Sequence, residues 1–89
     1  MYNMLLSIVL PVYNVERFLG ECLRSIYSQC SNRIDFEVVV VDDCSPDKSY
    51  KILDKYKEDY SNFKVLKHQE NKGLGAARNT GFRNIQGEY

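Results

Sequence analysis

Two patterns of hydrophobic positions alternate along the chain. A mostly apolar run lies at Leu5–Leu10, which Pro11 ends, and an uninterrupted one lies at Val38–Val41. A shorter run that alternates imperfectly lies at Phe63–His68. Four β-branched residues in succession indicate a strand covered on both faces, because a surface strand would alternate with polar residues. The runs therefore predict three strands, of which the second covers about Phe36–Asp42 and the third is expected at a sheet edge.

The segments between these runs repeat apolar residues at steps of three and four, which is the spacing of an amphipathic helix. The first predicted helix covers about residues 15–29, with Asn14 as its N-cap. The second begins after Ser45, which is expected to be its N-cap, with Pro46 in the first helical position.

The third predicted helix covers about residues 74–85 and follows a polar loop that contains Gly73. Ala77 and Gly81 lie along one side of it, and their small size would let that side approach another element closely. Gly87 is expected to end this helix.

The predicted order is strand, helix, strand, helix, strand, helix, with short connections. Such alternation implies an α/β fold, in which helices cover both faces of a mainly parallel sheet in three layers, about half of a doubly wound domain. Ligands of such sheets bind at the carboxyl ends of the strands. The pattern stops where a fourth strand would normally pair beside the first, so we expect a fragment or a unit that must find a partner strand.

Composition narrows the classes of function. Lys and Arg together number 12, as do Asp and Glu, so the formal net charge of 0 gives no sign of a nucleic-acid-binding surface. No apolar run approaches the roughly 20 residues of a membrane-spanning helix, and the start lacks the features of a signal peptide. The three cysteines lack C-x-x-C spacing, which favours reduced thiols over a disulfide frame or zinc site. We expect a cytoplasmic protein, with a peripheral membrane location of the full-length protein as the alternative.

Asp42 and Asp43 end the second predicted strand, at the edge where α/β sheets bind ligands. Taken alone, they could equally solvate the strand end and assist the start of the next helix. The first strand–helix turn has no G-x-G-x-x-G, and neither a P-loop nor a G-x-S-x-G elbow occurs. Gly73 and Gly75 could present amides to a phosphate, although loop glycines more often only form turns.

Four segments, in this order and spacing, resemble family 2 glycosyltransferases, the inverting enzymes of the GT-A fold. They are Ser7–Asn14, Val39–Asp47, Asn71–Gly81 and Gly87–Tyr89. The resemblance covers essentially residues 1–89 and implies the amino-terminal, nucleotide-sugar-binding part of a Rossmann-like GT-A domain. It implies a parent enzyme of polysaccharide biosynthesis that transfers a sugar from a nucleotide diphosphate sugar, with UDP expected, to an acceptor hydroxyl with inversion.

The resemblance also implies which residues meet the nucleotide-sugar. Pro11, Val12 and Tyr13 would line the base and ribose, and Glu16 falls where the family often has an acid near the nucleotide. Simpler roles exist for two of them. Tyr13 could cap the hydrophobic layer, and Glu16 lies in the first turn of a helix, where the helix dipole favours an acid.

Further along the chain, Asp42 falls where the family places a carboxylate that accepts a hydrogen bond from the base. If the base is uracil, its N3–H would donate to the charged carboxylate of Asp42, and the charge would make this hydrogen bond strong. Asp43 is expected to support the turn. Gly73 and Arg78 would approach the ribose and diphosphate, since the planar guanidinium suits a phosphate. A structural ion pair is the alternative role for Arg78.

In the family, an apolar strand with an Asp-x-Asp-type motif follows the segment that matches Gly87–Tyr89, and it holds Mg²⁺ or Mn²⁺ on the diphosphate. The adjacent pair Asp42 and Asp43 comes one strand too early to be that motif. The carboxylate that deprotonates the acceptor belongs to the later half as well. We therefore expect no catalytic and no metal-binding residue in this chain, no transferase activity from it alone, and weak binding of UDP.

Two other classes remain open. A non-catalytic interaction module would form a homo-oligomer through the open edge of the first strand. A phosphoacceptor domain of the receiver type is disfavoured, because Asp42 and Asp43 end the second strand and no later strand-end Asp and Lys complete the set. His68, the single histidine, is expected to have a structural or surface role.

Overall fold

The computed structural model describes residues 6–30 and 35–85. Within these residues, strands and helices alternate in the predicted order. The expectations for Leu5 and for Gly87–Tyr89 lie outside the described residues. The elements are β1 (Leu6–Val12), α1 (Glu16–Gln29), β2 (Phe36–Asp42), α2 (Ser49–Asp59), β3 (Phe63–Lys67) and α3 (Leu74–Phe82).

The three strands form one parallel sheet in the order β1-β2-β3, so β2 lies in the centre. Leu10 lies opposite Val40, which in turn lies opposite Val65. Every residue of β2 is buried, and Val38–Val41 have a relative exposure of 0%. The predicted strand with two covered faces is therefore confirmed, as is the position of β3 at an edge of the described sheet.

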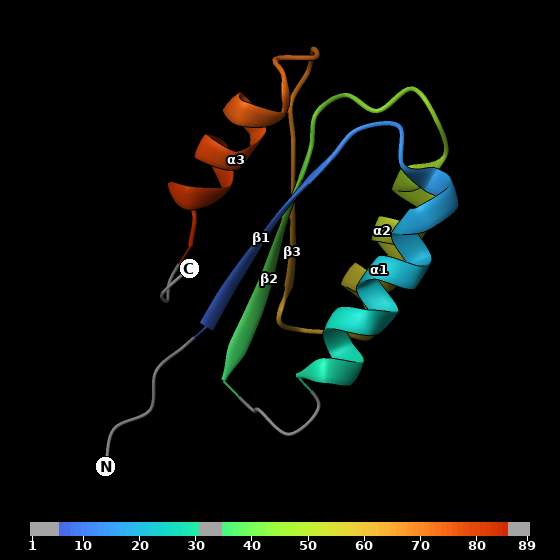
Figure 1. Ribbon diagram of the computed structural model, residues 1–89, viewed down its shortest axis with the longest axis vertical. Coiled ribbons are helices and arrows are strands. Elements are labelled where there is room, and N and C mark those ends of the chain that lie inside the picture. Colours follow the sequence, from blue (N-terminus) through green and yellow to red (C-terminus); the bar gives the residue numbers. More distant parts are fainter. Residues whose placement is uncertain (1–5, 31–34, 86–89) are drawn as a thin grey trace.

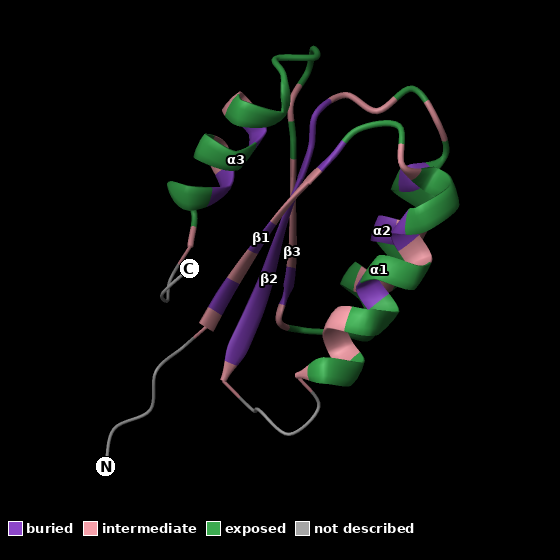
Figure 2. Ribbon diagram, in the orientation of Figure 1, coloured by how far each residue is buried: buried purple, intermediate pink, exposed green. Residues whose placement is uncertain are grey.

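Helices α1 and α2 cover one face of the sheet, and α3 covers the other (Figure 1). On the first face, Leu19 and Leu23 of α1 and Leu53 of α2 belong to one buried cluster with Val38 and Val40. Figure 2 shows burial along the whole of β2, while the outer surfaces of the helices are exposed. These three layers confirm the predicted α/β class.

On the second face, α3 packs closely through its small residues. Ala77 is fully buried, and a Cβ atom at Gly81 would lie 2.3 Å from Cγ1 of Val9. Real Cβ contacts are longer than this, so the present distance between α3 and β1 requires glycine at this position. The predicted close approach of this helix side is confirmed.

Strand β1 continues through Pro11 to Val12, although we expected it to end before the proline. The amide of Leu6 donates to Asp35, and Val12 accepts from the amide of Asp43, so alternate residues of β1 direct their backbone groups toward β2. Pro11 falls between these positions, and its nitrogen lies on the outer side of an edge strand. No ladder hydrogen bond is lost there, which explains why the strand tolerates proline.

The expected N-caps of the first two helices are wrong. Helix α1 begins at Glu16 without a side-chain cap, and Asn14 instead adopts a φ of 55°, with its amide donating to Oγ of Ser45 at 2.8 Å. Helix α2 begins at Ser49 rather than after Ser45. The hydroxyl of Ser45 donates to Oδ1 of Asp47 at 2.6 Å, and this contact stabilises a loop where we predicted a first helical turn.

Helix α3 begins at Leu74 as predicted but ends at Phe82 rather than near residue 85. The amide of Asn84 donates to the carbonyl oxygen of Gly81 at 3.0 Å, and its side-chain amide donates to the carbonyl oxygen of Thr80 at 2.8 Å. These two bonds satisfy carbonyl groups at the end of the helix and turn the chain there.

Candidate functional site

The carboxyl ends of the three strands bring three loops to one edge of the sheet. Strand register aligns Val12 with Asp42 and Asp42 with Lys67. The loops that follow these residues therefore start side by side, and Figure 1 shows them beyond the same end of the sheet. This is the edge where open α/β sheets bind ligands.

Asp42 is the last residue of the central strand and is only 3% exposed. Its Oδ1 accepts a hydrogen bond of 2.8 Å from the amide of Ser45. Its Oδ2 has no hydrogen-bond partner among residues 6–30 and 35–85. Asp42 therefore has one carboxylate oxygen committed to the loop and one available to a further donor.

Asp43 is fully buried, and both of its carboxylate oxygens are occupied. Oδ1 accepts from the amide of Lys72 at 2.9 Å and pairs with Nδ1 of His68 at 2.7 Å, and Oδ2 accepts from the amide of Gly73 at 2.8 Å. Burial by itself would raise the pKa of Asp43, but the hydrogen bonds from His68 and the two amides outweigh it and lower the pKa. Asp43 has the expected supporting role, but the loop that it supports follows β3.

His68 connects this carboxylate to α3. Its Nε2 lies 2.8 Å from Oγ1 of Thr80, while Nδ1 contacts Asp43 as described. The expected structural role of His68 is confirmed in kind, but its two partners were not anticipated. Both lie far away in the sequence, 25 and 12 residues from His68, so no local pattern could reveal them.

Glu16 is engaged in protein contacts. Its amide donates to Oδ2 of Asp47 at 2.9 Å, and its Oε1 accepts from the amide of Lys48 at 3.0 Å. Asp47 also accepts from the amide of Ser49 at 3.0 Å. Burial would raise the pKa of Asp47, but hydrogen bonds from Ser45, Ser49 and Glu16 lower it well below its usual range. Glu16 therefore joins the start of α1 to the loop before α2.

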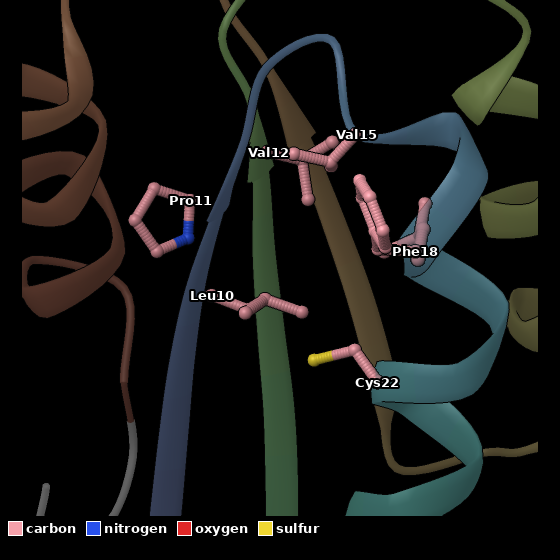
Figure 3. A pocket seen from close by; sticks show the side chains of 7 residues that line it. Leu10, Pro11, Val12, Val15, Phe18 and Cys22 are labelled. Atoms are coloured by element: carbon pink, nitrogen blue, oxygen red, sulfur yellow. The ribbon is translucent and has the colours of Figure 1, made fainter.

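The residues after the middle of β1 differ in what they can offer a ligand. Val12 is fully buried and Tyr13 is 38% exposed, so of these two residues only Tyr13 has a side chain open to solvent. Figure 3 shows Pro11 on the opposite side of β1 from Leu10 and Val12, as strand alternation requires.

An apolar pocket of about 160 Å³ lies between β1 and α1 (Figure 3). Its apolar side chains and one thiol include no strong group for reading a base or a phosphate. It does not contain Tyr13, Asp42 or Arg78, so it does not join the expected site residues. It is lined by Leu10, Pro11, Val12, Val15, Phe18, Leu19 and Cys22.

Gly73 and Arg78 lie in and after the loop that Asp43 holds. Gly73 adopts a backbone φ of 92°, which residues other than glycine rarely adopt. Arg78 is exposed and forms no hydrogen bond or ion pair with the described residues. The structural ion pair considered for Arg78 is therefore not found in that part of the chain, and its guanidinium is free to meet an anion.

The described residues contain neither a candidate metal centre nor a candidate membrane span. No three His, Cys, Asp or Glu side chains within residues 6–30 and 35–85 converge as ligands for a metal ion. In the same residues, no helix has the length and apolar character to cross a membrane.

The family model described as Glycosyl transferase family 2 matches residues 7–89. The chain belongs to this family. The resemblance read from the four sequence segments is therefore confirmed, together with the expected α/β unit of the GT-A type.

Relatives of this family-2 chain share its sequence over nearly its whole length. It is 44% identical over 87 residues to the poly(ribitol-phosphate) beta-glucosyltransferase of Bacillus spizizenii, covering 97% of this chain and 14% of that protein. It is 39% identical over 84 residues to the poly(ribitol-phosphate) beta-N-acetylglucosaminyltransferase TarS of Staphylococcus aureus, again covering 14% of the relative. The chain thus spans about one seventh of the length of these relatives.

Solved structures agree with these relationships. TarS 1–349 of S. aureus in complex with UDP-GlcNAc superimposes with a TM-score of 0.84 at 39% identity, covering 94% of this chain and 24% of that one. A mannosyltransferase from Pyrobaculum calidifontis in complex with GDP-Man and Mn²⁺ superimposes with a TM-score of 0.85 at 29% identity, covering 98% and 26%. The solved structures that this chain resembles thus include both a UDP-sugar and a GDP-sugar complex.

Proposed function

We propose that this chain forms the amino-terminal, nucleotide-sugar-binding part of an inverting glycosyltransferase that uses a UDP-sugar as donor and an acceptor hydroxyl. The observation that carries the proposal is the difference between the two acids at the end of β2. Asp43 is saturated by protein donors, whereas Oδ2 of Asp42 has no partner among the described residues. Family membership supports this role, as does the UDP-GlcNAc complex of TarS.

The carboxylate of Asp42 is suited to bases that present a ring N–H donor. An ionised carboxylate only accepts hydrogen bonds, so it pairs with the N3–H of uracil and is repelled by the lone pair at N3 of cytosine. The N1–H of guanine would also suit it, so Asp42 by itself does not separate UDP from GDP. We favour UDP because the TarS complexes resemble this chain more in sequence than the GDP-Man complex does.

The structure supports a nucleotide contact more strongly for some of the other proposed site residues than for others. Tyr13 and Arg78 have exposed side chains at or near the carboxyl edge, and Gly73 shapes the loop beside them. Pro11 and Val12 would contact a nucleotide only at the margin, since Val12 is buried. The contacts of Glu16 with Lys48 and Asp47 favour a supporting role over a ligand contact.

A divalent metal and a catalytic base belong to the proposed activity of the whole enzyme. The described residues offer no cluster for a metal, and Asp43 is already occupied by His68 and two amides. No step involving a metal is therefore assigned to this chain. We propose that residues outside the described part hold the cation and deprotonate the acceptor.

The test is a chemical-shift titration of the whole chain with UDP and CDP. We expect weak binding of UDP and binding of CDP at least about tenfold weaker, a difference of about 1.4 kcal/mol that one charge-assisted hydrogen bond can supply. Asp42→Asn keeps an oxygen for the Ser45 amide and should bring the two affinities within about threefold. Asp54→Asn, at an exposed position of α2, is the control and should behave as wild type.

Two outcomes would contradict the proposal. If neither nucleotide at about 10 mM changes the chemical shifts of residues at the carboxyl edge, the proposal that this chain binds nucleotides is wrong. If UDP binds and Asp42→Asn leaves the preference over CDP intact, Asp42 does not read the base.

A second candidate function, assembly of copies through β1, is favoured by one observation: β1 is an edge strand of the described sheet. Pro11 weakens it, because proline offers no N–H on that outer side. Sedimentation velocity over about a fiftyfold range of protein concentration tests whether copies assemble. A single monomeric boundary throughout would exclude assembly.

A further inference from the structure

Asp43, His68 and Thr80 form a continuous side-chain bridge that the proposed base-reading role of Asp42 does not use. Nδ1 of His68 lies 2.7 Å from Oδ1 of Asp43, and Nε2 lies 2.8 Å from Oγ1 of Thr80. The side chains of His68 and Asp43 are only 10% and 0% exposed. The bridge therefore joins the end of β2, the end of β3 and the last turn of α3 beneath the carboxyl edge.

The partners determine how the bridge is protonated. The amides of Lys72 and Gly73 already donate to Asp43 and stabilise its charged form. Nδ1 of His68 must therefore carry the hydrogen that Asp43 accepts. In the neutral ring, Nε2 then accepts from the hydroxyl of Thr80, so each polar atom of the bridge has a partner of the right kind.

The same carboxylate also holds the beginning of α3. Gly73 is the N-cap of this helix, and no side chain of its own first turn caps it. Its amide is shared between Oδ2 of Asp43 at 2.8 Å and Oδ1 of Asn71 at 3.0 Å. The position of the first turn of α3 thus depends on Asp43, and the orientation of Asp43 depends on His68.

A hydroxyl–imidazole–carboxylate series also occurs in hydrolytic triads. In the α/β-hydrolase form of that arrangement, the hydroxyl lies on a sharp, exposed strand-to-helix turn. Thr80 instead lies inside α3 (Leu74–Phe82), at the end of a bridge that starts from a buried acid. The position of Thr80 therefore favours a structural role of the bridge over a role of the hydroxyl as a nucleophile.

We propose that His68 is a positioning residue of the nucleotide site, which through Asp43 and Thr80 fixes the loop 69–73 and the first turn of α3 for a nucleotide diphosphate. This inference rests on the proposed function, in which Gly73 and Arg78 approach the diphosphate. His68 itself touches no part of the nucleotide in this scheme. It acts on the diphosphate and leaves the contact of the base with Asp42 unchanged.

The test compares binding of UDP and of uridine by chemical-shift titration of the whole chain. Thr80→Val removes the hydroxyl at nearly constant volume, and His68→Asn keeps a donor near Nδ1 but does not reach Thr80. We expect both variants to lose about five- to tenfold in UDP affinity and less than twofold in uridine affinity. Thr80→Ser retains the hydroxyl and should restore the wild-type ratio of the two affinities.

This ratio separates positioning from general destabilisation, because a smaller folded fraction lowers the apparent affinity for both ligands equally. An equal loss for UDP and uridine, or no loss for either, would overturn the positioning role. Retention of the wild-type ratio by both bridge variants would overturn it as well.

Amide hydrogen exchange distinguishes the failure of this inference from the failure of the proposed function. We expect the amides of Lys72 and Gly73 to exchange at least about tenfold faster in His68→Asn, with the β2 amides unchanged. If wild type binds neither UDP nor uridine, the nucleotide role is overturned, and faster exchange would still support the bridge as an anchor of the loop. Unchanged exchange at both amides would overturn the anchor itself.

Discussion

The amide of Glu16 donates a hydrogen bond of 2.9 Å to Oδ2 of Asp47, across 31 positions of sequence. In return, Oε1 of Glu16 accepts from the amide of Lys48 at 3.0 Å. The amide of Asn14 adds a third contact, to Oγ of Ser45 at 2.8 Å. The loops after β1 and β2 are thus joined, so the carboxyl edge is one connected structure rather than separate turns.

Asp47 is the central acceptor of this connection. We expect Asp47→Ala to lower the free energy of unfolding by about 1–3 kcal/mol, because the amides of Glu16 and Ser49 lose their acceptor. Urea unfolding followed by circular dichroism measures the change. Asp54→Ala, at an exposed position of the following helix α2, is the matched control. Its free energy of unfolding should stay within about 0.5 kcal/mol of that of wild type. Equal effects of the two substitutions would refute this role of Asp47.

The chain should lose stability in acid through Asp43 and Asp47. Although burial opposes it, hydrogen bonds lower the pKa of both carboxyls from the ordinary value of 3.8. A lowered pKa means that the unfolded state takes up protons first, so these contributions are complete above about pH 4 and disappear as the pH falls further. Each group can add a slope of up to about 1.4 kcal/mol per pH unit.

Urea midpoints measured between about pH 2 and pH 7 test this dependence. Asp47→Asn cannot titrate at this position, so its curve should be flatter than that of wild type below about pH 4. The explanation fails if the wild-type midpoint is constant over this range or if Asp47→Asn retains the full slope.

Two glycines of α3 should respond oppositely to alanine. Gly81→Ala would place Cβ 2.3 Å from Cγ1 of Val9, so we expect a loss of about 1–3 kcal/mol from overpacking. Gly75→Ala has no atom within 4 Å of the new Cβ, so we expect a gain of about 0.5–1 kcal/mol from helix propensity. Thermal and urea unfolding measure both changes.

A double substitution shows whether the steric contact causes the effect. In the Val9→Ala background, the atom that a Cβ at Gly81 would meet is absent, so Gly81→Ala should cost much less than in wild type. Strictly additive effects of the two substitutions would show that the contact with Val9 is not responsible.

The elements with strong local patterns could be predicted from the sequence. Val38–Val41 indicated the central strand because four β-branched residues fit only a site with both faces covered. The small residues Ala77 and Gly81 indicated a close helix–sheet contact for a similar local reason. The family could also be read from the sequence, because its motifs are short segments in a set order.

The helix starts and the site could not be predicted in the same way. Local capping rules suggested Asn14 and Ser45, but these two residues contact each other across 31 positions. Similarly, adjacent acids at the end of β2 look alike in sequence, and only the loop after β3 occupies Asp43 and leaves an oxygen of Asp42 available.

By itself, then, the sequence determined the order of elements, the buried central strand and the family, since each of these depends on residue type and spacing along the chain. Only the tertiary structure decided which acid is saturated, where α1 and α2 begin, and that His68 joins Asp43 to Thr80. The physical reason is that parallel strand register brings the ends of β1, β2 and β3 together. Hydrogen-bond partners at that edge are therefore chosen by proximity in space, which spacing along the chain does not encode.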